Sequence, residues 1–134
     1  MNSRTLVTVA AVALMMLGTS RPASAQERYD FKIPFNFVAN GRAFTAGQYV
    51  LYANQEGDVL TLESRDAKGG TVMLPVETRL AERKPLAEPE VVFDKLNGQD
   101  YVSELLVPGD DGYLVLVTKA KHSHSSLKGT RIKK

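Results

Sequence analysis

The chain contains no cysteine and no tryptophan among its 134 residues. Without cysteine it has no disulfide, no thiol nucleophile and no thiolate ligand for a metal ion. Small exported domains often use disulfides to compensate for a small hydrophobic core. A domain of this composition must therefore be stabilised by side-chain packing and by sheet hydrogen bonds alone.

Histidine is nearly absent, because the chain has only His122 and His124. The body of the sequence thus offers no residue for a Ser-His-Asp or other histidine-based acid–base mechanism. The H-x-H pair could bind copper, nickel or zinc weakly, since imidazole suits these metals. No cysteine and no neighbouring carboxylate in the sequence completes a site, so we expect no specific metal centre and no cofactor.

No hydrophobic run is long enough to span a bilayer, which needs about 20 apolar residues. An uncharged run over residues 6–17 follows a basic start at Arg4 and precedes Ala23-Ser24-Ala25. This order is typical of a secretory signal peptide, with a short membrane anchor as the alternative. We predict that residues 1–25 are a signal peptide and that the protein is periplasmic or extracellular.

Charge is balanced overall, with a formal net charge of +2, but it is unevenly distributed. Residues 26–118 carry 9 basic and 15 acidic residues, whereas residues 119–134 carry 6 basic and no acidic residues. Such a dipolar chain is not typical of a nucleic-acid binder. We expect 119–134 to be a flexible tail that could bind an anionic polymer or an envelope or extracellular protein, or fold back onto the acidic body of the chain. The candidate binding residues in the tail are Lys121, Lys128, Arg131, Lys133 and Lys134.

Alternation of apolar and polar residues with a period of two dominates residues 26–118 and predicts β-strands. Asn40-Gly41 and Asn97-Gly98 are turn pairs that favour tight hairpins. The predicted strands cover residues 31–37, 48–53, 59–65, 71–76, 90–96, 101–107 and 113–118. Seven strands at these spacings predict a single all-β domain, an antiparallel β-sandwich or a small barrel.

Pro34 lies inside the first predicted strand. Proline has no amide hydrogen to donate to a neighbouring strand, so it is tolerated at an edge but not in the centre of a sheet. A proline at an edge also hinders pairing with a strand of another molecule. We therefore predict that residues 31–37 form an edge strand whose phenylalanines face the core.

Two further groups of residues are candidates for function. The carboxylates of Asp94, Asp100 and Glu104 could act as acid and base on a glycan, although solvent-facing charges on a sheet are the commoner explanation. The tyrosines could form a platform for a carbohydrate or peptide, although strand tyrosines are more often half-buried packing residues. The tyrosines are Tyr29, Tyr49, Tyr52, Tyr101 and Tyr113, of which Tyr49, Tyr52 and Tyr101 are the binding candidates.

Three motifs give the chain a resemblance to a known group: Pro34-Phe35-Asn36-Phe37, Ala46-Gly47-Gln48-Tyr49, and Val92-Phe93 followed by Tyr101. In these motifs it resembles small secreted all-β proteins of uncharacterised function that are abundant in Acidobacteria. The resemblance covers most of residues 31–107 and implies export and an all-β domain, but no activity. Relatives often carry histidine where this chain has Asp94, and the H-x-H ending is unlike theirs, so no histidine role can be transferred.

These observations favour a non-catalytic binding or structural module of the cell envelope or the extracellular space. We expect no catalytic residues. The alternatives are a glycan-active enzyme that depends on carboxylates, and a carrier of a small ligand inside a β-barrel.

Overall fold

The computed structural model describes residues 27–66, 68–81 and 85–132, which fold entirely as β-structure. The predicted signal peptide lies outside the described residues. No helix that is long and apolar enough to cross a membrane occurs in the part of the chain that the structure describes. The strands are β1 (Arg28–Ile33), β2 (Phe37–Ala39), β3 (Arg42–Phe44), β4 (Gly47–Ala53), β5 (Val59–Ser64), β6 (Thr71–Pro75), β7 (Thr78–Leu80), β8 (Glu90–Leu96), β9 (Gln99–Leu106), β10 (Gly112–Leu114), β11 (Ser123–Lys128) and β12 (Thr130–Arg131).

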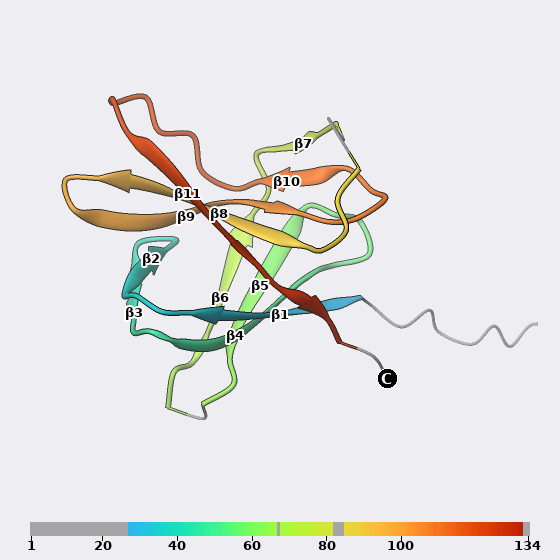
Figure 1. The fold of residues 1–134 in the computed structure, drawn as a ribbon, viewed down its shortest axis with the longest axis horizontal. Coiled ribbons are helices and arrows are strands. Elements are labelled where there is room, and N and C mark those ends of the chain that lie inside the picture. The colour runs from blue at the N-terminus through green and yellow to red at the C-terminus, as the bar shows by residue number, and fades with distance from the viewer. Residues whose placement is uncertain (1–26, 67, 82–84, 133–134) are drawn as a thin grey trace, which may run out of the picture.

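The strands form two layers (Figure 1). Sheet A has the order β12-β1-β4-β5-β6, and sheet B has the order β11-β8-β9-β10-β7, with β2 and β3 joined to it through β9. The fold is thus an all-β sandwich, as predicted, and not a closed barrel. It has more strands than the seven expected, because short segments next to the turns and two segments of the predicted tail also pair. All pairings are antiparallel except the contact of β2 with β9.

Pro34 does not lie in an edge strand, so that prediction is wrong. Strand β1 pairs with β4 on one side and β12 on the other, and it ends at Ile33, directly before the proline. Strand β2 then begins at Phe37 in the other sheet. Because proline cannot donate a backbone hydrogen bond, it ends the pairing of β1 at the point where the chain crosses between the sheets.

Both Asn-Gly turns form as predicted. Asn40 and Gly41 join β2 to β3 with φ values of 48° and 74°, and Asn97 and Gly98 join β8 to β9 with φ values of 52° and 75°. Positive φ at both central residues is the geometry of a type I′ turn, which asparagine and glycine tolerate best.

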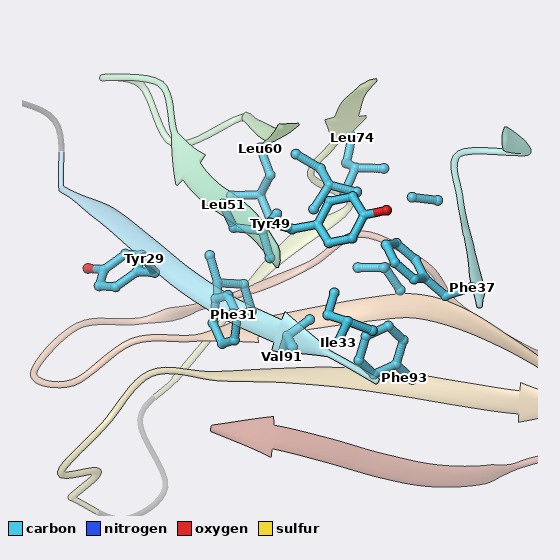
Figure 2. Packing of buried hydrophobic residues seen from close by; sticks show 14 of the residues in the cluster. Tyr29, Phe31, Ile33, Phe37, Tyr49, Leu51, Leu60, Leu74, Val91 and Phe93 are labelled. Atoms are coloured by element: carbon cyan, nitrogen blue, oxygen red, sulfur yellow. The ribbon is translucent and has the colours of Figure 1, made fainter. Parts of the chain in front are cut away.

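The core lies between the sheets and is filled by aromatic and aliphatic side chains (Figure 2). Phe31 and Ile33 of β1 point toward Val91 and Phe93 of β8, and all four are at most 1% exposed. Phe37 is fully buried. Its ring contacts those of Phe44, Tyr49 and Phe93, with ring centroids 5.0–5.7 Å apart. The alternation of residues 31–37 therefore did identify a core face.

The C-terminal part of the sequence differs most from expectation. Residues 113–118 were predicted as one strand, but β10 ends at Leu114. Residues 119–132 were predicted as part of a flexible tail, yet they contain β11, which pairs with β8, and β12, which pairs with β1. We call residues 119–132 the C-terminal strap. In Figure 1 the strap (dark orange to red) runs diagonally from sheet B to sheet A.

Candidate metal centre

Asp94 is the centre of the most unusual group of polar side chains in the described residues. In β8, Val91 and Phe93 belong to the core, so the pleat of the strand turns Asp94 toward the outer face of sheet B. An acidic residue on that face would ordinarily be solvated, and the sequence suggested the same. The structure shows the contrary, since Asp94 is only 2% exposed.

Asp94 is buried because the segment after β10 passes over it and contributes three polar side chains. The hydroxyl of Thr118 donates a hydrogen bond of 2.8 Å to Oδ2 of Asp94. Nδ1 of His124 lies 2.8 Å from Oδ1, and Nε2 of His122 lies 3.7 Å from Oδ2. Within the described residues, Asp94 has no lysine or arginine partner, and its basic neighbours are these two imidazoles.

A bulge in β9 helps to direct this segment. Val92 lies opposite Glu104 and Phe93 opposite Val102, which leaves Ser103 as an extra residue in β9. The carbonyl of Ser103 accepts the amides of Val115 and Leu116, and its hydroxyl donates to the carbonyl of Leu116. These bonds hold the chain next to β9 just before it reaches Thr118.

The register of β11 places one histidine opposite the acid. His124 of β11 pairs directly with Asp94 of β8, and side chains at opposed positions lie on the same face of a sheet. His122 is two residues earlier and approaches the same carboxylate. The two rings meet edge to face, with centroids 4.7 Å apart. His122 is 18% exposed and His124 is 60% exposed in their side chains.

The hydrogen bonds also define the nitrogen atoms that are free. Nδ1 of His122 lies 2.7 Å from the carbonyl oxygen of Ala120, which can only accept, so Nδ1 carries the hydrogen and Nε2 has the lone pair. In metalloproteins, the non-ligating ring nitrogen usually donates to a carbonyl or carboxylate in this way. His122 is therefore oriented as a metal-ligating histidine would be.

Donor atoms of Asp94, His122 and His124 all lie within 4.8 Å of one another. Ligand atoms bound at about 2.0–2.1 Å to a tetrahedral ion lie about 3.3 Å from one another. The distance from Nδ1 of His124 to Oδ1 of Asp94, 2.8 Å, is shorter than this, and the distance from Nε2 of His122 to Oδ2, 3.7 Å, is longer. A small rotation of His124 would thus open room for an ion. Two imidazoles and one carboxylate suit zinc, copper(II) or nickel, whereas calcium and magnesium prefer oxygen ligands.

The sequence did not reveal this cluster. The H-x-H pair has no third ligand close to it in the sequence, so the sequence predicted no specific metal site. The missing carboxylate is Asp94, 30 residues away in the sequence. Alternation could have shown that Asp94 leaves the core face of its strand. Nothing in a single sequence indicated that β11 exists or that it pairs with β8 in this register.

Neither of the other acidic candidates belongs to the group of donor atoms around Asp94 in the described residues. Asp100 lies opposite Lys95, one position along from the Asp94–Tyr101 pair, so alternation turns it toward the other face of the sheet. Glu104 is half-buried opposite Val92. The groups enclosing Asp94 are a threonine and two histidines, not a second acid.

The tyrosines do not form an exposed platform. Tyr49 is 2% exposed and its hydroxyl donates to the carbonyl of Thr45, so it cannot contact a ligand. Tyr29 and Tyr113 are also buried. Tyr52 is half-buried on the outer face of sheet A, with its hydroxyl bonded to Glu63 and the guanidinium of Arg28 over its ring. Tyr101 is half-buried and lies opposite Asp94, the carboxylate that the two histidines approach.

The basic candidates are spread along the strap and do not converge. Lys121 and Lys128 are exposed; Lys121 precedes β11 by two residues, and Lys128 is its last residue. Arg131 of β12 lies 3.6 Å from the carboxylate of Glu27. Lys133 and Lys134 lie outside the described residues. The described basic residues therefore gather no common binding surface.

The arrangement of Asp94, Thr118, His122 and His124 is the feature of this chain with the clearest chemistry. Comparison of the chain with protein-family models, with curated proteins and with solved structures gives no match.

Proposed function

We propose that this protein is a non-catalytic exported module that binds one divalent transition-metal ion through Asp94, His122 and His124. The observation that carries the proposal is the convergence of two imidazoles on a buried carboxylate that has no lysine or arginine partner among the described residues. Export is part of the proposal and is supported by the signal-like residues 1–25.

The proposed ion would take the place of a hydrogen bond. Nδ1 of His124 now donates its hydrogen to Oδ1 of Asp94. An ion bound between these atoms requires the lone pair at Nδ1, so the hydrogen of the neutral ring would move to Nε2. The hydroxyl of Thr118 keeps its hydrogen bond to Oδ2 and fixes the orientation of the carboxylate. Metal binding is expected to weaken at low pH, because protons compete with the ion for the ligating nitrogen and oxygen atoms.

The test is calorimetric titration of the secreted chain with Zn²⁺, Ni²⁺ and Cu²⁺, and with Ca²⁺ and Mg²⁺ for comparison. We expect one transition-metal ion per chain and no binding of Ca²⁺ or Mg²⁺ at matched concentrations. His122→Ala, His124→Ala and Asp94→Asn should each lower the affinity at least tenfold. Asp100→Asn and Ser125→Ala remove polar groups from the same sheet without touching the cluster, and they should bind as the wild type does.

Equal affinity of the cluster variants and the wild type would contradict the proposal. So would tighter binding of Ca²⁺ than of Zn²⁺, since that order requires an oxygen-rich site.

A further inference from the structure

The C-terminal strap connects the two sheets of the sandwich. Strand β11 pairs with β8 in sheet B, and β12 pairs with β1 in sheet A. Between them, the amide of Gly129 donates a hydrogen bond to the carbonyl of Pro89, and after β12 the amide of Ile132 donates to the carbonyl of Arg28. A single short segment therefore closes one side of both sheets.

Gly129 marks the crossing point between β11 and β12. A Cβ atom at this position would lie 2.5 Å from the backbone oxygen of Asp30 and 2.5 Å from the ring of Phe31. The backbone oxygen belongs to a paired strand and cannot move aside easily. The strap thus lies so close to β1 at this position that only glycine, which has no Cβ, fits.

Apart from this crossing, the strap has little apolar packing. The side chains of residues 123–126 are exposed, and Leu127 is the one strap residue in the described chain that packs partly against the core cluster. A segment held mainly by exposed backbone hydrogen bonds opens locally at a lower free energy than the core strands do. The side chains of the strap also make polar contacts with the body, and the shortest of these joins His124 to Asp94 at 2.8 Å.

We infer that the metal ion acts as a clasp: when it is bound, it holds the strap paired with β8 and β1. This inference rests on the proposed function. His122 and His124 belong to the strap, whereas Asp94 belongs to β8 in the body of the fold, so all three ligands meet only in the docked state. An ion that binds the docked state better than the open one must stabilise docking, and docking must strengthen ion binding by the same factor.

The size of the effect follows from mass action. If the ion binds only the docked state, its presence lowers the open population by a factor of 1 + [metal]/Kd, which is about 100 when the free metal is about 100 times Kd. Opening of the strap would uncover one edge of β8 and one edge of β1. Unpaired edges are sites at which another strand can add to a sheet, so the ion would regulate access to them.

Hydrogen exchange of the full secreted chain, with Zn²⁺ or with a chelator, measures the coupling directly. Amides of β11 and β12 should exchange more slowly in Zn²⁺, by a factor that rises with the free Zn²⁺ concentration. Amides of the β4–β5 hairpin provide the internal control and should change little. Calorimetry on the same sample separates the two proposals. Failure of Zn²⁺, Ni²⁺ and Cu²⁺ alike to bind rejects the proposed function, whereas binding of the ion without protection of β11 and β12 rejects the clasp.

The effect of strap docking on ion binding is tested with variants that weaken the packing of the strap and keep all three ligands. Leu127→Ala removes the apolar contact of the strap and should lower the Zn²⁺ affinity several-fold. Val72→Ala makes a similar apolar truncation on β6 of sheet A and should leave the affinity unchanged. Gly129→Ala should lower the Zn²⁺ affinity more strongly than Leu127→Ala does. If Gly129→Ala does not fold, the affinity of Leu127→Ala still tests the clasp. Equal affinity of Leu127→Ala and the wild type would overturn the clasp.

Discussion

His124 of β11 stands directly opposite Asp94 of β8, with Nδ1 of the histidine 2.8 Å from Oδ1 of the acid. This pair joins the last long strand of the chain to a strand of the core. It also explains how a carboxylate on the outer face of a sheet is 2% exposed, since Thr118 and His122 complete the cover over it.

Asp94→Ala should lower the free energy of unfolding by about 1–3 kcal/mol in the absence of metal, because it leaves the Thr118 hydroxyl and Nδ1 of His124 without their partner. Urea unfolding of the chelated protein measures the change. Asp100→Ala, on the same hairpin but outside the cluster, should change the stability less. A cost for Asp94→Ala no larger than for Asp100→Ala would show that the contacts of the carboxylate contribute nothing to stability.

Thr118→Val should weaken Zn²⁺ binding by roughly ten- to a hundred-fold, the usual effect of removing a hydrogen bond to a ligating group. The hydroxyl does not bind the ion, but its 2.8 Å bond orients the Asp94 carboxylate. Thr118→Ser keeps the hydroxyl and should restore most of the affinity. Calorimetry can compare the three proteins, and a serine variant as weak as the valine variant would assign the effect to packing instead.

Alkaline pH should destabilise the fold through Tyr29. Burial raises the pKa of its hydroxyl well above the ordinary value of 10.0, and the hydrogen bond to Glu27 raises the pKa further. A group with a raised pKa in the folded state contributes its full stability below the unfolded value and loses it as the pH rises toward the folded value. The free energy of unfolding should thus fall above about pH 10, by at most about 1.4 kcal/mol per pH unit for this group.

Tyr29→Phe cannot ionise at this position, so its stability should fall less steeply than that of the wild type over the same pH range. Urea unfolding at several pH values above 9 gives both slopes. Parallel slopes for the two proteins would show that Tyr29 does not cause the alkaline loss.

The free edge of β6 should become prone to association when its polar cover is removed. Nδ2 of Asn40 donates to the carbonyl of Met73, and Nη1 of Arg42 donates to the carbonyl of Thr71, both at 3.0 Å. These side chains occupy acceptors on an edge that another chain could otherwise pair with. The double variant Asn40→Gly, Arg42→Ala should therefore form dimers or larger species as concentration rises, as measured by light scattering.

The glycine in that variant preserves the positive φ of 48° at position 40, so the turn itself should persist. Asn97→Gly combined with Lys95→Ala makes the matched change in the β8–β9 hairpin, away from β6. It should remain monomeric if the wild type does. Association of both variants to the same extent would show that the edge of β6 has no special role.

The local features of the fold could be predicted because each depends on neighbouring residues. Asn40-Gly41 and Asn97-Gly98 adopt the predicted turns, since positive φ is a property of the residues themselves. Phe31, Ile33 and Phe37 face the core because the direction of a side chain alternates along any strand. The order of strands in the sheets does not follow from such patterns, and the edge position assigned to Pro34 was wrong for this reason.

The sequence by itself determined that the chain forms strands, where its tight turns lie and which faces of those strands are apolar, because these depend on interactions between residues close in the chain. Only the tertiary structure decided that the basic C-terminal segment pairs with both sheets, that Tyr49 is enclosed and that Asp94 meets His122 and His124. Such contacts depend on strand register, which is set by the packing of the whole sandwich.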